Sequence, residues 1–189
     1  TINNNANNRV ITGSGSANTL EGESTFTFDG TKVHINAGAG SNLQVDGSGS
    51  YLQVAGIKIS MGLNSRSHNT AIGNGALSSA SGGQDCTAVG HNALQNSTSG
   101  SANTVVGSHA MIGTVTGSNN VAVGHGALNK NTSGYNNTAV GRLAGLELLG
   151  GHNNTFLGLE AGTNNTSGSA NIYAGSGAGK YETTTLYNV

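Results

Sequence analysis

The feature that most constrains this chain is a glycine that recurs every 17 residues. The seven positions are Gly73, Gly90, Gly107, Gly124, Gly141, Gly158 and Gly175, and an alanine stands three residues after each of them. Seven units in a single register are typical of a repeat architecture, in which each unit packs mainly on its two neighbours. We number these units, or coils, from 1 to 7.

Two further columns of the repeat hold turn-forming residues. Four residues before the glycine stand Asn69, Cys86, Asn103, Asn120, Asn137, Asn154 and Asn171, which we call the asparagine column. A second glycine lies seven residues before the first in six coils, at Gly83, Gly100, Gly117, Gly134, Gly151 and Gly168. Glycine suits tight corners with positive φ, and asparagine tolerates that conformation while its amide can bond to its equivalent in the next coil. We interpret these columns as structural.

The residues between the turns predict strands. Seventeen residues are too few for a helix pair, and Val, Ile and Thr at period 2 favour β-structure. We therefore predict an all-β chain whose residues 62–180 form a parallel β-solenoid, or β-roll, of seven 17-residue coils stacked at about 4.8 Å. Residues 1–61 are predicted as an N-terminal strand and hairpin segment, with a hairpin over 26–35 around Asp29-Gly30, and 181–189 as a C-terminal tail.

Column composition suggests which side chains face inward. The valine column, one residue before the glycine, is apolar throughout: Ile72, Val89, Val106, Val123, Val140, Leu157 and Ala174. The alanine column, two before it, varies from alanine to tyrosine: Ala71, Ala88, Val105, Ala122, Ala139, Phe156 and Tyr173. Because a tight interior should not accept both alanine and tyrosine, we expect the valine column inside. Alternation then turns the threonine column inward too: Thr70, Thr87, Thr104, Val121, Thr138, Thr155 and Ile172.

A single copy of such a rod is expected to be only marginally stable. Each coil buries about four apolar side chains, at roughly 1.5 to 3 kcal/mol each, against about 1 kcal/mol or more for ordering each residue's backbone. Contact between the small Ala/Gly flanks of identical chains would add burial. We therefore predict a homotrimer, although other copy numbers satisfy the same argument.

Composition and charge exclude several classes of protein and of binding partner. Only 8% of the residues are charged, the net charge is -1 and there is no proline. Collagen is excluded by the absence of proline, and a strongly charged disordered chain does not fit either. A balanced charge gives no attraction to nucleic acid, and no apolar run is long enough to span a membrane, so we expect neither partner. The single cysteine, Cys86, cannot form an internal disulfide.

The repeat resembles known fibre sequences. Asn69-Thr70-Ala71-Ile72-Gly73 and Asn137-Thr138-Ala139-Val140-Gly141 are similar to the Asn-Ser-Val-Ala-Ile-Gly repeat of YadA-type trimeric adhesin heads. With Ala-Leu after the glycine and Asn-Thr-Ser-Gly before the next coil, the longer unit resembles repeat regions of bacteriophage and prophage tail fibres. Residues 9–31 also look like tail-fibre sequence. The resemblance implies a left-handed trimeric roll on a virion, in contact with adjoining fibre or tail proteins and with a host-surface glycan or protein.

The ends of the chain bear on that resemblance. YadA-type adhesins carry a signal peptide, a coiled-coil stalk and a membrane barrel, and Thr1–Asn5 lacks the basic and apolar parts of a signal peptide. Many fibres of this type end in a self-cleaving chaperone, which does not follow Tyr181–Val189. We therefore expect a matured product, a fragment or a fibre without such a domain. A bacterial surface adhesin and an extracellular filament protein stay open as alternatives.

Catalytic and metal chemistry are not predicted. His91 and His125 share a column two coils apart, about 9.6 Å, which is too far for one metal ion, and His109 is expected on the opposite face. Glu147 and Glu160 lie in different columns and make a poor acid pair. We expect no enzyme activity, no metal and no cofactor.

Binding chemistry is predicted at one place on the surface. Tyr135 and His152 are adjacent rings in an otherwise small polar column, and Arg142 and Glu160 break the pattern nearby. Stacking and bidentate hydrogen bonds from these four residues could hold a sugar ring, although they could equally fill a groove between copies. An ice-binding solenoid is disfavoured here because the threonine column is predicted to face inward.

Overall fold

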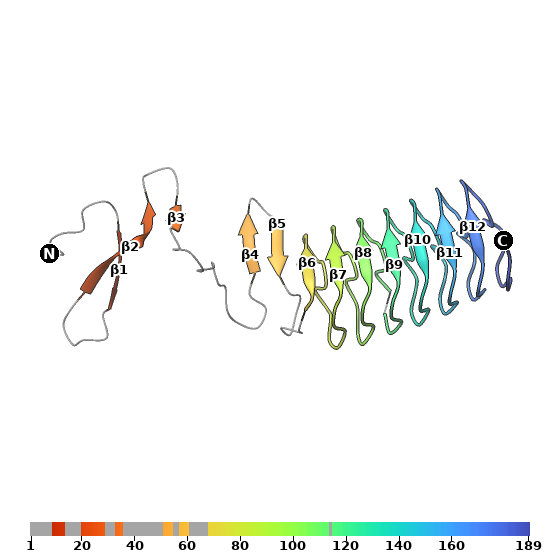
Figure 1. Ribbon diagram of the computed structural model, residues 1–189, viewed down its shortest axis with the longest axis horizontal. Helices are drawn as coiled ribbons and strands as arrows, with labels where there is room; N and C mark the ends of the chain where they lie inside the picture. Colours follow the sequence, from red (N-terminus) through yellow and green to blue (C-terminus); the bar gives the residue numbers. More distant parts are fainter. Residues whose placement is uncertain are drawn as a thin grey trace. The chain divides into compact units, whose positions relative to one another are not determined.

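The computed structural model describes residues 9–13, 20–28, 33–35, 51–54, 57–60, 68–113 and 115–189. It divides the chain into two compact units, Thr1–Val45 and Asp46–Val189. All regular elements in these described residues are β-strands (Figure 1). No helix long and apolar enough to cross a membrane occurs among them.

The first unit contains a small antiparallel sheet. Its strands are β1 (Arg9–Gly13), β2 (Leu20–Phe28) and β3 (Val33–Ile35), in the order β1-β2-β3. Strands β2 and β3 pair Phe26 with Ile35 and Phe28 with Val33. The hairpin predicted for residues 26–35 is confirmed, while its turn at 29–32 lies outside the described residues.

The second unit is built on one nine-stranded sheet, ordered β4 to β12 (Figure 1). Strands β4 (Tyr51–Val54) and β5 (Ile57–Ser60) form an antiparallel hairpin, and β5 pairs with the first coil. The remaining strands are parallel: β6 (Thr70–Ile72), β7 (Thr87–Val89), β8 (Thr104–Val106), β9 (Val121–Val123), β10 (Thr138–Val140), β11 (Thr155–Leu157) and β12 (Ile172–Ala174). Each residue pairs with the one 17 positions away, as Thr138 does with Thr155. The predicted parallel β-solenoid with 17-residue coils is confirmed.

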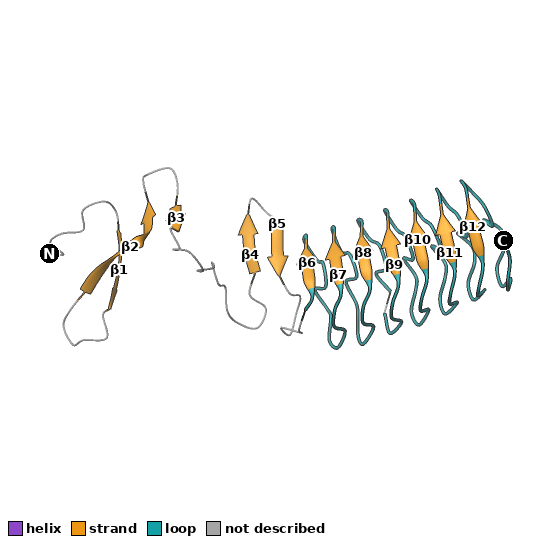
Figure 2. Ribbon diagram, viewed as in Figure 1, coloured by secondary structure: helices purple, strands orange, loops and turns teal. Residues whose placement is uncertain are grey.

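Each coil has a single short strand, and turns close the rest of the circuit (Figure 2). The glycine that follows the strand has a positive φ, +134° at Gly90, and a Cβ there would lie 2.6 Å from the carbonyl oxygen of Gly107 in the next coil. Glycine is therefore required both for its conformation and for the close approach of backbones. Gly100, in the second glycine column, is required for space alone, because a Cβ would overlap the carbonyl oxygen of Gly117.

The buried asparagine column forms a hydrogen-bond ladder that runs without a break from Asn103 to Asn171. Asn120 Oδ1 accepts the backbone N–H of Asn137 at 3.0 Å and Asn137 Nδ2 at 3.1 Å, and Asn137 Nδ2 also donates to the carbonyl of Gly151 at 2.8 Å. The predicted amide ladder is confirmed. It also runs one step further, because Asn171 Oδ1 accepts the N–H of Asn188.

Cys86 takes the asparagine position in coil 2. Its backbone N–H donates to Asn69 Oδ1 at 2.8 Å, as in the other coils, and its thiol Sγ lies 3.5 Å from the carbonyl of Gly100. The thiol partly replaces the amide, but it offers no strong acceptor to coil 3.

The inward-facing column is the alanine column, so the prediction that valine faces inward is wrong. Ala88, Ala122 and Ala139 are completely buried, whereas Val106 and Val140 in the valine column are 38% and 39% exposed. In each of the parallel strands β6 to β12 the middle residue is buried and both flanking residues are exposed or half-buried. The threonine column therefore also faces solvent, together with the valine column.

A neighbouring column explains why one interior accepts both alanine and tyrosine. Four residues after the glycine lies what we call the leucine column: Leu77, Leu94, Met111, Leu128, Gly145, Gly162 and Gly179. The aromatic members of the alanine column, Phe156 and Tyr173, have glycine opposite, because a Cβ at Gly162 would overlap the Phe156 ring and one at Gly179 the Tyr173 ring. The interior is kept full by exchange of volume between two columns, which single-column reasoning misses.

The prediction that copies of the chain meet through their Ala/Gly flanks is also wrong. The alanines three residues after the glycine, such as Ala93, Ala127 and Ala144, are completely buried within one chain. They pack in the same core cluster as the alanine column. Any contact between copies must therefore use a different surface.

Candidate functional surface

Tyr135 and His152 lie in equivalent positions of consecutive coils, in the loops that precede β10 and β11. The coils are joined there by the N–H of Asn153, which donates to the carbonyl of Tyr135 at 3.1 Å. The two rings stack with centroids 4.7 Å apart and planes 6° from parallel. The predicted stacking of this pair is confirmed.

One face of the Tyr135 ring is covered by His152, and no ring covers the other face. Ser169 of coil 7 holds His152 in place. Its Oγ accepts the backbone N–H of His152 at 3.1 Å and lies 3.1 Å from the ring atom Nδ1 of the same residue. On the other side of Tyr135 lies Ser118, whose carbonyl accepts the N–H of Asn136. Tyr135 is 43% exposed although His152 covers one of its faces. The pair therefore forms a step, one coil high, with the Tyr135 ring above a serine.

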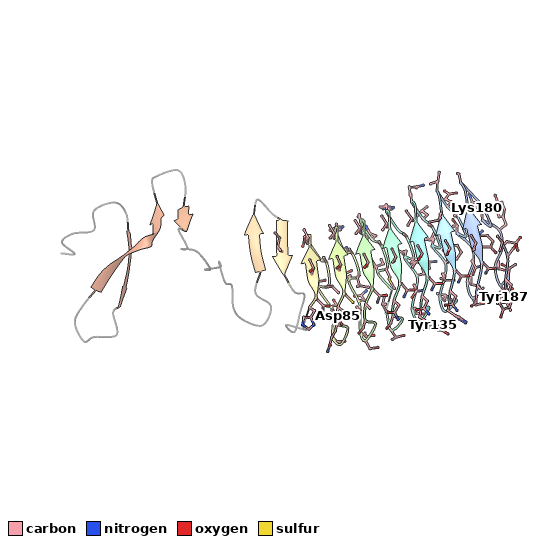
Figure 3. The ribbon with its side chains drawn as sticks, in the orientation of Figure 1. Asp85, Tyr135, Lys180 and Tyr187 are labelled. Atoms are coloured by element: carbon pink, nitrogen blue, oxygen red, sulfur yellow. The ribbon has the colours of Figure 1, made fainter. Side chains whose placement is uncertain are left out.

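Arg142 and Glu160 belong to a different group, at the far end of the strand. Arg142 Nη1 lies 3.8 Å from Glu160 Oε1, and Lys180 Nζ donates to Glu160 Oε2. The hydrogen bond from Lys180 lowers the pKa of the Glu160 carboxyl, and the same bond raises the pKa of Lys180. Tyr135 lies at one edge of the solenoid and Lys180 at the opposite edge (Figure 3).

These four residues therefore do not form one site. Tyr135 precedes strand β10, whereas Arg142 follows it, so the strand separates the aromatic step from the ion pairs. Lys180 was not predicted from the sequence, because it lies 20 residues after Glu160 and so shares no column with it. No spacing signal could have found it.

Three histidines form a cluster, and the prediction that His109 faces the opposite way from His91 and His125 is wrong. The rings of His91 and His109 are 4.9 Å apart, and those of His109 and His125 are 6.1 Å apart. His109 lies beside the other two because its φ of +55° belongs to a turn, where the alternation of a strand does not apply. Within the part of the chain that the structure describes, no group of three or more His, Cys, Asp or Glu residues could hold a metal ion.

The carboxylates of coils 5 and 6 are each engaged by a lysine. Glu147 Oε2 accepts from Lys130 Nζ at 2.8 Å, across one coil. Glu160 accepts from Lys180, as described above. The thiol of Cys86 is buried, and this burial raises its pKa.

The threonine and valine columns together form the outward face of the sheet, which we call the Thr/Val face. Neither column contains a charged residue in any coil. Leu157 and Ile172 are 41% and 46% exposed, similar to Val106 and Val140. Ile59 of β5 pairs with Ile72 and is also exposed, so the hairpin extends the apolar stripe by one strand.

The fold and this surface define a β-solenoid repeat protein with one outward sheet face whose threonine and valine columns carry no charge. No family model, curated protein or solved structure matches the chain.

Proposed function

We propose that this chain is a structural fibre module of a phage-like particle, which forms a homotrimer and attaches the particle to the host cell surface. The observation that carries the proposal is the in-register stack of 17-residue coils with an uncharged outward face. Such a stack grows along one axis and repeats the same surface at every coil. These properties suit a spacer and attachment element.

The residue pattern supports the placement on a virion. The Asn-Thr-Ala-Val-Gly units resemble tail-fibre repeats, and in that setting the ends of the chain would meet adjoining fibre or tail proteins. A left-handed roll is proposed on the same resemblance. A bacterial surface adhesin or a self-assembling extracellular filament protein is the alternative setting for the same architecture.

The aromatic step is the proposed contact point with a host-surface glycan or protein. A sugar ring could stack on the free face of Tyr135. The hydroxyl of Ser118, one coil away, accepts the N–H of Ser101 and keeps its own hydrogen to donate. Arg142 and Glu160 are not part of this contact, because Arg142 follows strand β10 and pairs with Glu160, which also binds Lys180.

Two measurements test this function. Light scattering of the purified chain should give three times its mass of 18.7 kDa. A glycan array or intact host cells should bind the wild-type chain, and Tyr135→Ser with His152→Ser should reduce that binding at least tenfold. Tyr181→Ser is the matched control, since Tyr181 is exposed elsewhere and should not matter. A monomeric wild type, or unchanged binding by the double variant, would contradict the respective part of the proposal.

An ice-binding solenoid is the second candidate, and the outward threonine column favours it. Ice binding was disfavoured on the expectation that the threonines face inward, whereas Thr104 is exposed and Thr138 is half-buried on the outward face of the sheet. A thermal-hysteresis assay of the chain decides this case. We expect no hysteresis, because the valine column occupies half of the face, so the threonine hydroxyls do not form a continuous surface. A measurable effect that is lost in Thr104→Lys would establish the second candidate.

A further inference from the structure

We infer that the Thr/Val face is the surface through which copies of this chain associate. The inference rests on the proposed homotrimer and specifies where its subunits meet. The surface expected from the sequence, the small Ala/Gly flank, is already buried inside each chain. The copies therefore need another apolar surface.

The Thr/Val face has the composition of an interface core. In its valine column Val106, Val140 and Leu157 are 38%, 39% and 41% exposed. The members Ile72, Val89 and Val123 are half-buried. No residue of either column is charged, so pairing two such faces removes no ion from water. Interface cores are depleted in charge in the same way.

The size of the whole face is close to one side of a standard interface. The two columns hold seven side chains each, and with on the order of 50 Å² exposed per side chain they form a patch of roughly 700 Å². The valine column supplies about half of this area, roughly 350 Å², which lies within the range of about 300 to 600 Å² for the largest apolar patch on a typical monomer. The whole face is comparable with the roughly 800 Å² that each partner buries in a standard interface. In a ring of three copies the face is divided between two neighbours, so each contact is about half that size, and Ile59 adds one further apolar side chain.

The periodicity of the face favours a second copy over an unrelated partner. Its ridges repeat once per coil, at the spacing of parallel strands, about 4.8 Å. Another copy of this chain presents ridges and grooves with the same repeat, so the two can interlock along their whole length. A globular partner has no reason to match that spacing.

The two unlike columns suit a threefold arrangement. The valine column runs along one side of the face and the threonine column along the other, two residues apart on every strand. In a ring of three parallel rods, the valine side of one copy can meet the threonine side of the next. Such head-to-tail contacts close when the rotation is 120°.

Charged groups make the other edges less suitable. The edge that holds Lys130 and Glu147 carries both charges within one coil of each other. The edge that holds Arg142, Glu160 and Lys180 carries three. Burying them in an interface would require desolvation that the Thr/Val face does not.

Lysine substitutions in the centre of the face test the inference. Val106→Lys and Val140→Lys each place an ammonium group in the proposed contact while leaving the interior of the coil untouched. We expect light scattering to show a change from three copies to one, with the β-sheet circular dichroism signal retained. Ser79→Lys is the matched control, because Ser79 is exposed and the equivalent position in coil 4 is Lys130. It should keep three copies.

The outcomes separate this inference from the function on which it rests. A trimeric wild type whose lysine variants stay trimeric would contradict the Thr/Val interface but not the proposed trimeric fibre. A monomeric wild type would contradict both. If a lysine variant loses its β-sheet signal, Val106→Thr replaces it. This variant should weaken trimer formation at least tenfold in dilution experiments, and unchanged dissociation would again contradict the interface. Thermal hysteresis in a monomeric wild type would instead identify ice as the occupant of the face.

Discussion

The ring of Phe156 lies against the Cα of Gly162, six residues later in the same coil. A Cβ on Gly162 would overlap the ring, and Gly145 of the preceding coil approaches the same ring from its other side. In coils 1, 2 and 4 the position of Gly162 holds leucine, and the position of Phe156 holds alanine. The interior of a coil is thus filled by a large side chain either in the leucine column or in the alanine column.

This exchange predicts a strong coupling between the two positions. Phe156→Ala should lower the free energy of unfolding by about 3 to 5 kcal/mol, because it leaves a cavity next to two glycines. Gly162→Leu should also destabilise, because the new side chain meets the ring. The double variant recreates the Ala and Leu pair of coils 1, 2 and 4 and should be more stable than the sum of the two changes predicts.

Urea unfolding of the wild type, both single variants and the double variant measures this coupling. A position four coils away serves as the control, because Leu94→Ala combined with Phe156→Ala should give additive effects. Additive effects for Phe156 and Gly162 as well would show that the two residues do not share one space.

Completion of the asparagine ladder should stabilise the chain. In Cys86→Asn the new amide would donate to Asn69 Oδ1 and to the carbonyl of Gly100, and its oxygen would accept the N–H of Asn103. These are the bonds that Asn137 makes between Asn120 and Asn154. We expect a gain of about 1 kcal/mol in the free energy of unfolding.

The comparison variant for the ladder is Cys86→Ala, which removes the thiol and adds no hydrogen bond. Thermal unfolding should rank Cys86→Asn above the wild type and Cys86→Ala below it. The ladder account fails if the asparagine variant unfolds at or below the temperature of the alanine variant.

The buried thiol gives the stability a dependence on alkaline pH. Burial raises the folded-state pKa of Cys86 above its ordinary value of 9.0. Above about pH 9 the unfolded chain loses a proton that the folded chain keeps, so the free energy of unfolding falls as the pH rises. Below pH 9 both states keep the proton and the thiol contributes no pH dependence.

Subtraction of a thiol-free variant isolates this effect. The difference in free energy of unfolding between wild type and Cys86→Ala should shrink from pH 8 to pH 10, because tyrosines and lysines titrate alike in both chains. A constant difference over this range would mean that the folded-state pKa is not raised.

Replacing Asn131 with a larger apolar residue should stabilise the chain. It is completely buried, and neither polar atom of its side chain has a hydrogen-bond partner among the described residues. Leu148 occupies the equivalent interior position 17 residues later. Asn131→Leu should therefore raise the free energy of unfolding by about 1 to 3 kcal/mol.

Asn120→Leu is the opposite case and the control for this change. Asn120 belongs to the ladder and bonds to Asn103 and Gly134, so the same substitution there should destabilise the chain. Equal effects at both positions in urea unfolding would contradict the distinction between paired and unpaired buried asparagines.

The spacing of glycine and asparagine was sufficient to predict the coil, its register and the ladder, because a strict period places equivalent residues above one another. The inward face was not predictable from one column at a time. The informative signal lay in two columns, where Leu128 gives way to Gly145 and Gly162 as Ala139 gives way to Phe156. Volume is conserved across the coil rather than within a column.

The surface was predictable only where it follows the period. Tyr135 and His152 stack because they are 17 residues apart on equivalent backbone. His109 meets His91 through a turn residue with positive φ, and Lys180 reaches Glu160 across 20 residues. Neither contact obeys strand alternation or the repeat, so the sequence pattern alone could not place them.

Distances between spin labels on neighbouring copies test the central claim most directly. With Cys86→Ala as background, Thr104→Cys places a label on the Thr/Val face, and Ser79→Cys places one on an exposed position elsewhere in the coil. We predict strong dipolar broadening between copies for the label at 104, because packed sheets lie about 10 Å apart, and none for the label at 79. Broadening at 79 but not at 104, or at neither position, would contradict an association through the outward sheet face.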